Sequence, residues 1–401
     1  MDWRELLKLH PQGPLTPHLE QDGAGRLSVA ERLVREGRAT IEEAAKMLGA
    51  TPDVVAQILA RQGAIVQKTI LVCGGAGFIG SNFIHYLLKK YPHYRVINYD
   101  KLTYAGNLDN VRNVERDPRY EFIQGDIADS DATDAVFKKG IDAVANFAAE
   151  THVGRSVYYG TKEFVHTNVL GVTTLLEAVR KYNVPRFVHI STDEVYGELA
   201  LNDARSFTEE SPFLPNVPYA AAKAGGDLMC RAYFESYKTP VIVTHCTNNF
   251  GPYQHPEKLI PYSIFRASAN QPLTIHGDGQ HIRDWIFVLD HCEALDRVLH
   301  HGKLGEVYNV GAGNEISTLE IAKFILSLLG KPSNLVTHVP DRPGNDRRYS
   351  INVSKIQREL GWKPAHTFEE AMPKTISWYQ ANHDWVERVR EKDKQSLSYT
   401  I

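Results

Sequence analysis

The segment from residue 68 to residue 100 constrains the fold more than any other part of the chain. An apolar, β-rich run, Thr69–Cys73, ends in a cluster of glycines, and an amphipathic stretch follows directly. The glycines of this cluster are Gly74, Gly75, Gly77 and Gly80. This order predicts a strand, a glycine turn and a helix, which is the opening unit of a parallel α/β sheet.

Each glycine of the turn has a physical reason. Gly74 permits the tight turn, Gly77 leaves bare backbone for a pyrophosphate to approach, and Gly80 lets the helix lie close to the strand. The helix that begins at Phe78 and Ile79 offers free amide donors and the positive end of its dipole. A second predicted strand, 95–99, ends at Asp100, where an acidic residue can bind the adenosine ribose hydroxyls. A lone glycine pattern is weak, but these features together predict a dinucleotide site.

From Lys68 onward, strand-like and helix-like segments alternate, which predicts βαβ units and a Rossmann-like, doubly wound parallel sheet. The expected strands are Thr69–Cys73, Arg95–Tyr99, Tyr120–Gln124, Ala143–Phe147, Arg186–Ile190 and Val241–Cys246. The expected helices include Asn168–Tyr182 and Tyr219–Tyr237. Gly125, Asp126 and Ile127 follow the third strand and could reach the adenine. Ala148, Ala149 and Glu150 follow the fourth strand, at the carboxyl-end crevice of such sheets. Taken singly, each of these loops is equally well read as an ordinary connection.

The candidate reactive residues lie in two segments. Thr192, Asp193 and Glu194 follow an apolar strand, so their side chains are expected at the strand-end crevice. Tyr219 and Lys223 open the next helix, and their four-residue spacing puts them on one face. A free phenol has a pKa near ~10, and a neighbouring ammonium with a cofactor cation favours the phenolate. After a dinucleotide loop, this pair indicates hydride transfer at a carbinol.

Composition excludes several other classes of protein. The chain of 401 residues has a formal net charge of −3, which gives no general reason to expect nucleic acid or an anionic membrane as a partner. Its four cysteines show no metal-binding or disulfide spacing, so no metal site is predicted, and Cys73 and Cys246 are expected to be buried. The N-terminal residues lack the pattern of a signal peptide, and no stretch is apolar enough to span a bilayer. A soluble, cytoplasmic protein is expected.

Residues 1–66 are expected to form a separate arm and helical extension. From residue 27 to residue 62, apolar residues recur at helix-turn-helix spacing, with Thr51 as N-cap. DNA binding is one interpretation, but these 66 residues hold eight Lys or Arg against nine Asp or Glu. The would-be recognition helix, 52–61, offers only Arg61, whereas a phosphate backbone requires a basic face. A docking or oligomerisation module is the favoured alternative.

These motifs resemble the extended short-chain dehydrogenase/reductases, and within them the dTDP-glucose 4,6-dehydratases. The resemblance covers residues 68 to about 395 and rests on the glycine turn, the adjacent Asp193 and Glu194, and Tyr219 with Lys223. Further matching segments are 100–107, 148–156, 248–253, 256–261, 283–285 and 341–349. The resemblance implies NAD as cofactor, which Asp100 also favours over NADP, and a homodimer formed through helices beside the active site.

The resemblance implies a dehydration in three stages. Tyr219 takes the proton of the sugar 4-hydroxyl during hydride transfer, while Lys223 tunes Tyr219 and holds the nicotinamide ribose. Thr192 steadies the 4-oxygen. Glu194 then removes the acidified C5 proton and a protonated Asp193 donates to the departing 6-hydroxyl, before the hydride returns to C6. Two adjacent carboxyls can divide these duties because burial and mutual repulsion keep one of them neutral.

The resemblance also implies a set of binding residues. The cofactor is expected to contact Gly74, Gly77, Phe78, Ile79, Gly80, Asp100, Lys101, Thr103, Gly106, Asp126, Ile127, Ala148, Ala149, Thr167, Tyr219, Lys223 and Asn249. The sugar nucleotide is expected to contact Thr151, His152, Thr192, Asn248, Lys258, Leu259, Thr274, His276, Arg283, Asn309, Arg342 and Asn345. Arginines are suited to the diphosphate, because a guanidinium binds phosphate oxygens through a bidentate fork.

The chain departs from the family's pattern at four positions, which are Thr151, Gly154, His276 and Asn345, where the family usually has Ser, Asp, Tyr and His. The last two leave uridine open beside thymine as the base, and the first leaves the sugar's C2 substituent open. An NDP-hexose 4,6-dehydratase, with dTDP-glucose as the preferred substrate, is nevertheless predicted. Epimerases and decarboxylases would not need the Asp193–Glu194 pair. An NAD-sensing DNA-binding regulator is the alternative of another class, but the reactive residues would have no function in it.

The expected domain organisation has three parts. Residues 1–66 form the extension, and residues 67–250 form the NAD-binding domain, to which part of 284–312 returns. Residues 251–401 form mainly the substrate domain.

Overall fold

The structure is a computed structural model, and it describes residues 68–158, 160–341 and 343–396 continuously. In the N-terminal region it describes positions 30, 31, 33, 41–52, 54, 55 and 59. The remainder of the predicted extension, including most of 52–61, lies outside the described residues. The helix α3 (Ile41–Leu48) packs Ala44, Ala45 and Leu48 into a small core of its own with Val55 and Leu59.

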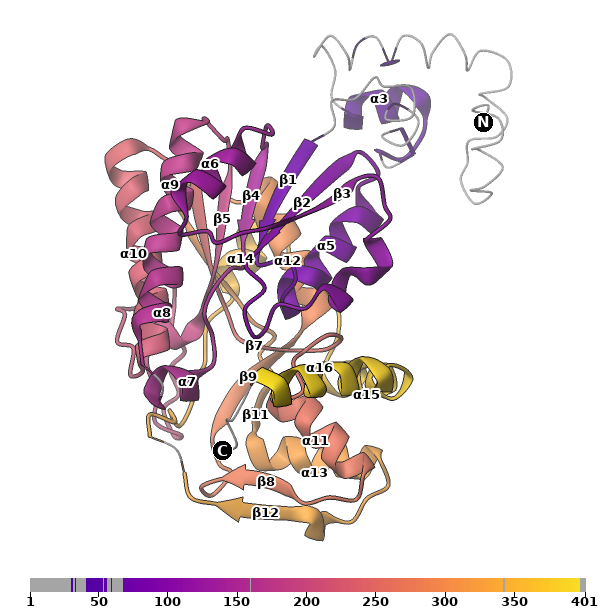
Figure 1. Ribbon diagram of the computed structural model, residues 1–401, viewed down its shortest axis with the longest axis vertical. Helices are drawn as coiled ribbons and strands as arrows, with labels where there is room; N and C mark the ends of the chain where they lie inside the picture. Colours follow the sequence, from indigo (N-terminus) through magenta and orange to yellow (C-terminus); the bar gives the residue numbers. More distant parts are fainter. Residues whose placement is uncertain are drawn as a thin grey trace. The chain divides into compact units, whose positions relative to one another are not determined.

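A seven-stranded sheet in the order β10-β6-β5-β4-β1-β2-β3 forms the centre of the larger part (Figure 1). The strands are β1 (Lys68–Cys73), β2 (Tyr94–Asp100), β3 (Tyr120–Gln124), β4 (Ala143–Asn146), β5 (Phe187–Thr192), β6 (Val241–Cys246) and β10 (Val307–Val310). The pairs β1–β4, β4–β5, β5–β6 and β6–β10 are parallel. The order reverses beside β1, so the predicted doubly wound fold is confirmed.

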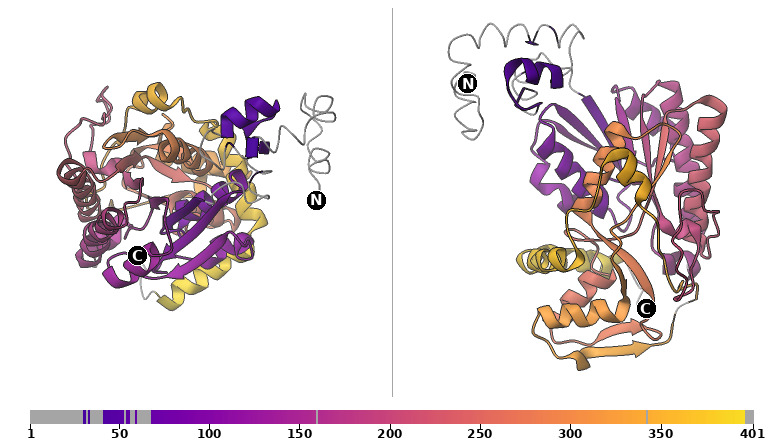
Figure 2. Two further views of the ribbon diagram at one scale, coloured as in Figure 1. Left: turned by 90° about the horizontal axis from the view of Figure 1, so that it is seen from above. Right: turned by 180° about the vertical axis from the view of Figure 1, so that it is seen from behind.

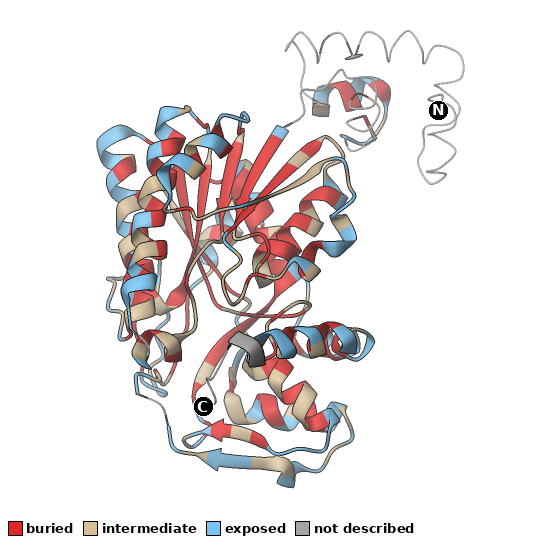
Figure 3. Cartoon of the chain, in the orientation of Figure 1, coloured by how far each residue is buried: buried red, intermediate tan, exposed pale blue. Residues whose placement is uncertain are grey.

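Helices cover both faces of this sheet, which explains why its central strands are apolar throughout (Figures 1 and 3). One face carries α6 (Ser130–Phe137), α9 (Val172–Lys181) and α10 (Pro218–Tyr237), and the other carries α5 (Phe78–Lys90) and α12 (Val288–His301), as the two further views show (Figure 2). Every residue of β4, β5 and β6 is buried. Cys73, Cys230, Cys246 and Cys292 are all buried free thiols.

The connection from β4 to β5 departs from a regular helix. The short helices α7 (Val153–Tyr158) and α8 (Lys162–Val165) lead into a π-helical turn, η2 (His166–Gly171), which continues as α9. The predicted helix 168–182 is therefore present, but it begins earlier and is widened at η2. This wide turn places Thr167 and Asn168 in buried positions.

A smaller lobe follows the sheet and carries its own core. Its strands are β7 (Asn248–Phe250), β9 (Ile282–Phe287) and β11 (Glu315–Ser317) in one sheet, with β8 (Leu273–His276) and β12 (Val336–Val339) in another. Its helices are α11 (Leu259–Ser268), α13 (Thr318–Leu328), α15 (Phe368–Ala381) and α16 (His383–Ser396). The helix α14 (Ser354–Leu360) instead packs against β10 and α12 of the larger part (Figure 1). Short 3₁₀ turns are η1 (Leu108–Val114), η3 (Asp193–Tyr196) and η4 (Ser333–Leu335). None of the helices in the described residues has the length and apolar character needed to cross a bilayer.

Candidate active site

The reactive segment begins inside a strand rather than after it. β5 runs on to Thr192, two residues beyond the predicted end, and the turn η3 starts at Asp193. The Thr192 hydroxyl caps this turn by accepting a hydrogen bond from the Glu194 amide at 3.3 Å. It also donates to Asp193 Oδ1 at 3.4 Å. One capped turn therefore fixes all three polar side chains at the carboxyl end of the sheet.

Asp193 and Glu194 occupy unequal environments. Asp193 is 2% exposed, and its Oδ2 atom has no hydrogen-bond partner among the described residues. Burial first, then the negative charges of Glu194 and Asp284, raise the pKa of Asp193 well above its usual value. Arg283 opposes this shift only in part. Asp193 is thus held in its neutral acid form, whereas Glu194, half-buried, is the member of the pair that is closer to solvent.

Tyr219 lies at the start of α10, where Pro218 occupies the first turn. Its hydroxyl hydrogen-bonds with the side chains of Thr151 and Thr192, which brings the phenol to the Thr192–Glu194 turn. Burial and the charge of Glu194 raise the pKa of Tyr219, and the two threonine hydrogen bonds lower it. The sequence predicted that Lys223 lowers the pKa of Tyr219, but Lys223 is not among the groups that cause the shift.

The reason lies in the position of the Lys223 ammonium. Lys223 is 3% exposed, and its Nζ donates to the Ile190 carbonyl oxygen of β5 at 2.7 Å. Burial lowers the pKa of Lys223, and the carboxylate of Asp227 raises it. The shared helical face predicted for Tyr219 and Lys223 is present, but the ammonium is bound to the strand.

The glycine turn shows why larger residues are excluded. Gly74 has φ +74°, and a Cβ there would come within 2.5 Å of the Ala148 amide nitrogen. At Gly80 a Cβ would lie 2.3 Å from the Gly74 carbonyl oxygen. Gly77 is open, with the Gly74 carbonyl at 3.3 Å as its nearest neighbour. The first turn of α5 holds no acidic residue, so its positive dipole end remains available to an anion.

A pocket beside this turn collects most of the predicted cofactor residues. Those that line it are Gly74, Gly77, Asp100, Lys101, Thr103, Gly106, Asp126, Ile127, Ala148, Ala149 and Thr167. The pocket is completed by Gly125 and Glu150, which belong to the predicted loops after the third and fourth strands, and by Tyr99, Ala105 and Phe147, which were not predicted as contacts. Each of these last three directly precedes a predicted residue, so proximity in the sequence is the signal that could have found them.

The acidic residues of this pocket have distinct partners. Asp100 accepts hydrogen bonds from the backbone amides of Ala76 (2.9 Å) and Leu102 (2.8 Å), which fixes the loop after β2 against the glycine turn. Lys101 turns away from Asp100 and forms an ion pair with Asp126 at 2.8 Å. The ammonium is therefore already neutralised, and Asp100 is the acidic group nearest the glycine turn.

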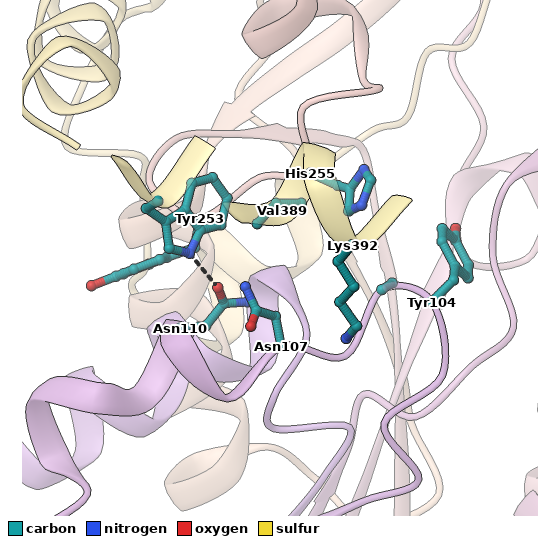
Figure 4. Close-up of a pocket in the computed structure, with 9 residues that line it drawn as sticks. Tyr104, Asn107, Asn110, Tyr253, His255, Val389 and Lys392 are labelled. Atoms are coloured by element: carbon teal, nitrogen blue, oxygen red, sulfur yellow. Dashed lines mark hydrogen bonds between the residues drawn. The ribbon is translucent and has the colours of Figure 1, made fainter. Parts of the chain in front are cut away.

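A second, smaller pocket adjoins the loop after β2, beneath α16 (Figure 4). Lys392 of α16 donates to the Gly106 carbonyl oxygen at 2.8 Å, and Trp385 Nε1 donates to Asn110 Oδ1 at 3.0 Å. Arg388 pairs with Asp109 at 2.6 Å. The C-terminal helix therefore holds the loop that lines the first pocket, a role that no local sequence pattern indicates.

Most of the predicted substrate residues lie on the smaller lobe and on the loop after β4, whereas Thr192 is on β5 and Asn309 is on β10. Thr151 and His152 are on that loop, Asn248 is on β7, Lys258 and Leu259 begin α11, and Thr274 and His276 are on β8. The Arg283 guanidinium lies 4.2 Å from the Tyr349 ring centroid, and its Nη2 donates to Asn345 Oδ1 at 3.4 Å. Arg283 also affects Asp193 electrostatically, so the smaller lobe reaches the acid pair.

Two predicted contacts have side chains that make hydrogen bonds within the protein core. Asn309 is 0% exposed, accepts from the Tyr196 hydroxyl, and donates to two backbone carbonyls. Asn249 is 7% exposed, donates to the Thr247 carbonyl, and bonds His291 through Oδ1. Asn309 has no amide hydrogen left for a ligand, whereas Asn249 keeps one, so the ligand contacts of both residues remain predictions. Arg342 lies outside the described residues.

The doubly wound sheet, the glycine turn and the Tyr219–Lys223 helix together define a dinucleotide-binding enzyme of the short-chain dehydrogenase/reductase class. The family model described as GDP-mannose 4,6 dehydratase matches residues 71–375. The dTDP-glucose 4,6-dehydratase of Xanthomonas campestris pv. campestris (strain B100) is 46% identical over 340 residues, covering 80% of this chain and 95% of the relative. That of Streptomyces niveus is 46% identical over 333 residues, covering 82% and 98%.

Solved structures agree with these relatives. The dTDP-glucose 4,6-dehydratase of Bacillus anthracis str. Ames in complex with NAD has a TM-score of 0.76 and 46% identity, covering 80% of this chain and 99% of that one. A UDP-glucuronic acid 4-epimerase from Bacillus cereus has a TM-score of 0.73 at 27% identity, covering 78% and 99%. The chain belongs to the dTDP-glucose 4,6-dehydratase family.

Proposed function

We propose that this chain catalyses the NAD-dependent dehydration of dTDP-glucose to dTDP-4-keto-6-deoxyglucose. The observation that carries the proposal is the acid pair at the end of β5, where a neutral Asp193 and Glu194 share one turn with Thr192, next to the Tyr219 hydroxyl. An epimerase requires oxidation at C4 but no elimination, so it has no use for an acid and a base at this position. The similarity to dTDP-glucose 4,6-dehydratases favours the same reaction.

The residues around the glycine turn fit NAD. Gly77 is open toward the pocket, the N-terminus of α5 offers amides to a pyrophosphate, and Asp100 can accept from ribose hydroxyls. A 2′-phosphate would meet the Asp100 carboxylate, which favours NAD over NADP. NAD held by these residues would supply the hydride chemistry at C4 and C6, and its positively charged nicotinamide would oppose the raised pKa of Tyr219.

The protein groups carry the proton transfers. Tyr219 takes the proton of the 4-hydroxyl, and Thr192 binds the same oxygen. The 4-ketone acidifies the proton at C5, which Glu194 removes as general base. Asp193 donates its proton to the 6-hydroxyl, which leaves as water, and reprotonation of C5 completes the product. Two adjacent carboxyls perform these opposite steps because the environment separates their pKa values.

A substrate panel tests the proposed function. The purified protein is incubated with dTDP-glucose, UDP-glucose, GDP-mannose and UDP-N-acetylglucosamine, and products are followed by mass. Turnover of dTDP-glucose with the loss of one water is expected. Dehydration of UDP-glucose in preference to dTDP-glucose would show that the protein recognises uracil rather than thymine. Interconversion of sugars without water loss would contradict the dehydratase assignment.

The binding groups for the nucleotide sugar are proposed to come from both lobes. Thr151 and His152 on the loop after β4, and Asn248, Lys258, Leu259, Thr274, His276, Arg283, Arg342 and Asn345 on the substrate side, form this set. Arg283 supports the assignment most strongly, because its guanidinium lies near Asp193 and stacks on Tyr349. Residues 67–250 are proposed as the NAD-binding domain and residues 251–401 as mainly the substrate domain. The pairing of β10 with β6 supports the return of part of 284–312 to the NAD-binding domain. A cytoplasmic location is proposed for the enzyme.

A homodimer formed through α8, η2 and α10 is also proposed. These adjacent elements expose Val165 (51%), Leu170 (49%) and Leu228 (54%), a set of apolar side chains that contact with a second copy would bury. The double variant Leu170→Glu/Leu228→Glu is expected to run as a monomer in light scattering after gel filtration. Leu304→Glu, which alters a comparably exposed leucine (42%) elsewhere, is the control and should remain dimeric. An unaltered dimer in the double variant would place the interface elsewhere.

A further inference from the structure

A buried polar cluster lies against the inner face of α10, one turn beyond Lys223. Asp227 belongs to α10, His189 and Ser191 to β5, and His245 to β6, and these side chains are between 0% and 4% exposed. A carboxylate this far from water is costly unless charges and hydrogen bonds compensate it. The cluster therefore needs a physical explanation.

The two oxygens of Asp227 are treated differently. Ser191 Oγ donates to Oδ2 at 2.8 Å, and His245 Nε2 lies 3.2 Å from the same oxygen. Oδ1 has no hydrogen-bond partner among the described residues, and His189 Nε2 lies 3.5 Å from it. Hydrogen bonds therefore stabilise the negative charge at Oδ2, whereas Oδ1 depends on nearby positive charge.

Proton counting fixes the state of His189. Asn146 Oδ1 accepts from the Ala148 amide at 3.1 Å, so the Asn146 amide nitrogen faces His189 Nδ1 at 3.1 Å and donates to it. His189 is then neutral, with its proton on Nε2 toward Asp227. Burial lowers the pKa of His189 to about 3, which agrees with this assignment.

The same argument applies to the hydrogen bonds around His245. Asn309 uses its amide nitrogen for two carbonyls, so its Oδ1 accepts from the Tyr196 hydroxyl at 2.9 Å. The Tyr196 oxygen must then accept from His245 Nδ1 at 2.6 Å, while His245 Nε2 donates to Asp227. His245 therefore hydrogen-bonds to Asp227 Oδ2, and the Lys223 ammonium is a cation close enough to interact with the Asp227 carboxylate.

We propose that Asp227 is a positioning residue whose carboxylate keeps Lys223 protonated beneath the nicotinamide site, an inference that rests on the proposed function. Lys223 stands one helical turn before Asp227, and its ammonium donates to a neutral carbonyl, Ile190 O. The other titratable groups near it, Cys230 on α10 and Cys246 on β6, are buried thiols whose pKa values are raised, so they are neutral. The Asp227 carboxylate is thus the negative charge that acts on the Lys223 ammonium.

The variant Asp227→Asn tests this role, because it keeps the size of the side chain and removes its charge. Burial already lowers the pKa of Lys223, and losing Asp227 lowers it further. Since the ammonium is lost as pH rises through its pKa, the variant should work at acid pH and fail earlier on the alkaline side. We expect the alkaline limb of kcat, and the fall in NAD retained after gel filtration, to move down by about one pH unit or more.

Asp296→Asn is the matched control, because Asp296 is equally buried (2%) but lies on α12, hydrogen-bonded to Tyr86. Its two pH midpoints should match those of the unaltered protein. The retention of NAD requires no sugar substrate, so it tests Asp227 even where dTDP-glucose is not turned over. Unchanged midpoints in Asp227→Asn would overturn the proposal.

A double-mutant cycle gives a second measurement that does not depend on activity. Lys223→Met should lower the Tm of the unaltered protein, because it leaves the Asp227 carboxylate less compensated. The same change introduced into Asp227→Asn should raise the Tm, because it removes a buried ammonium that has lost its counter-charge. Additive changes in Tm would show that Asp227 serves only Ser191 and His245, and would overturn the proposal.

Discussion

The Tyr219→Phe variant is expected to lose dehydration of dTDP-glucose by about 10²–10⁴-fold, the usual contribution of a positioned acid–base group. Its ring would remain in place against Phe164, while the hydroxyl that bonds with Thr151 and Thr192 would be missing. Oxidation at C4 should therefore fail before elimination can begin. The measurement is reduced cofactor formed in a single turnover, together with product by mass.

Tyr182→Phe is the control for this variant. It removes a hydroxyl that donates to Asp134 at 2.7 Å. Tyr182 ends α9 before β5 begins, whereas the acid pair follows the other end of β5, so turnover should be retained. Both proteins should carry as much NAD as the unaltered chain, so that a lost cofactor is not mistaken for lost chemistry. Rapid formation of reduced cofactor by Tyr219→Phe would remove Tyr219 as the base for the 4-hydroxyl.

The Glu194→Gln variant is expected to separate oxidation from elimination. Gln keeps the shape of the side chain but cannot accept the C5 proton, so some reduced cofactor should form while water loss falls by about 10²–10⁴-fold. Loss of the negative charge also removes one cause of the raised pKa values of Asp193 and Tyr219, which leaves oxidation less affected than elimination. Exchange of the C5 proton with heavy water, followed by NMR, should disappear with the base.

Glu210→Gln, at an exposed position in the following loop, is the control and should retain both exchange and turnover. Elimination at the normal rate by Glu194→Gln would transfer the role of base to another group.

The central sheet is predictable from the sequence because its strands are continuous apolar runs punctuated by glycine and polar turns. β3 and β6 have the predicted bounds, β1 and β4 differ by one residue at one end, and β2 is one residue longer at each end. β5 is longer than predicted because Ser191 and Thr192, although polar, are buried and paired with β6. The small strands β8 and β12 pair across a long sequence separation, which local patterns do not encode.

The candidate site is less predictable, because the spacing of two residues on a helix does not say which groups their side chains contact. Tyr219 and Lys223 share a face, yet the ammonium is bound to Ile190, and the phenol receives its pKa shift from burial and Glu194. Asn309 was predicted to contact the sugar nucleotide, but its amide completes a core network that depends on Tyr196 and His245. Asp227 was not singled out, although its position four residues after Lys223 was a usable signal.

The path of one hydrogen tests the central claim most directly. dTDP-glucose labelled with deuterium at C4 is converted in ordinary water, and the label is located in the product by NMR. If the hydride taken from C4 is held on the bound cofactor while Glu194 and Asp193 expel water, the deuterium should appear in the C6 methyl group. Deuterium that stays at C4, or that is released to solvent without reaching C6, would contradict the account.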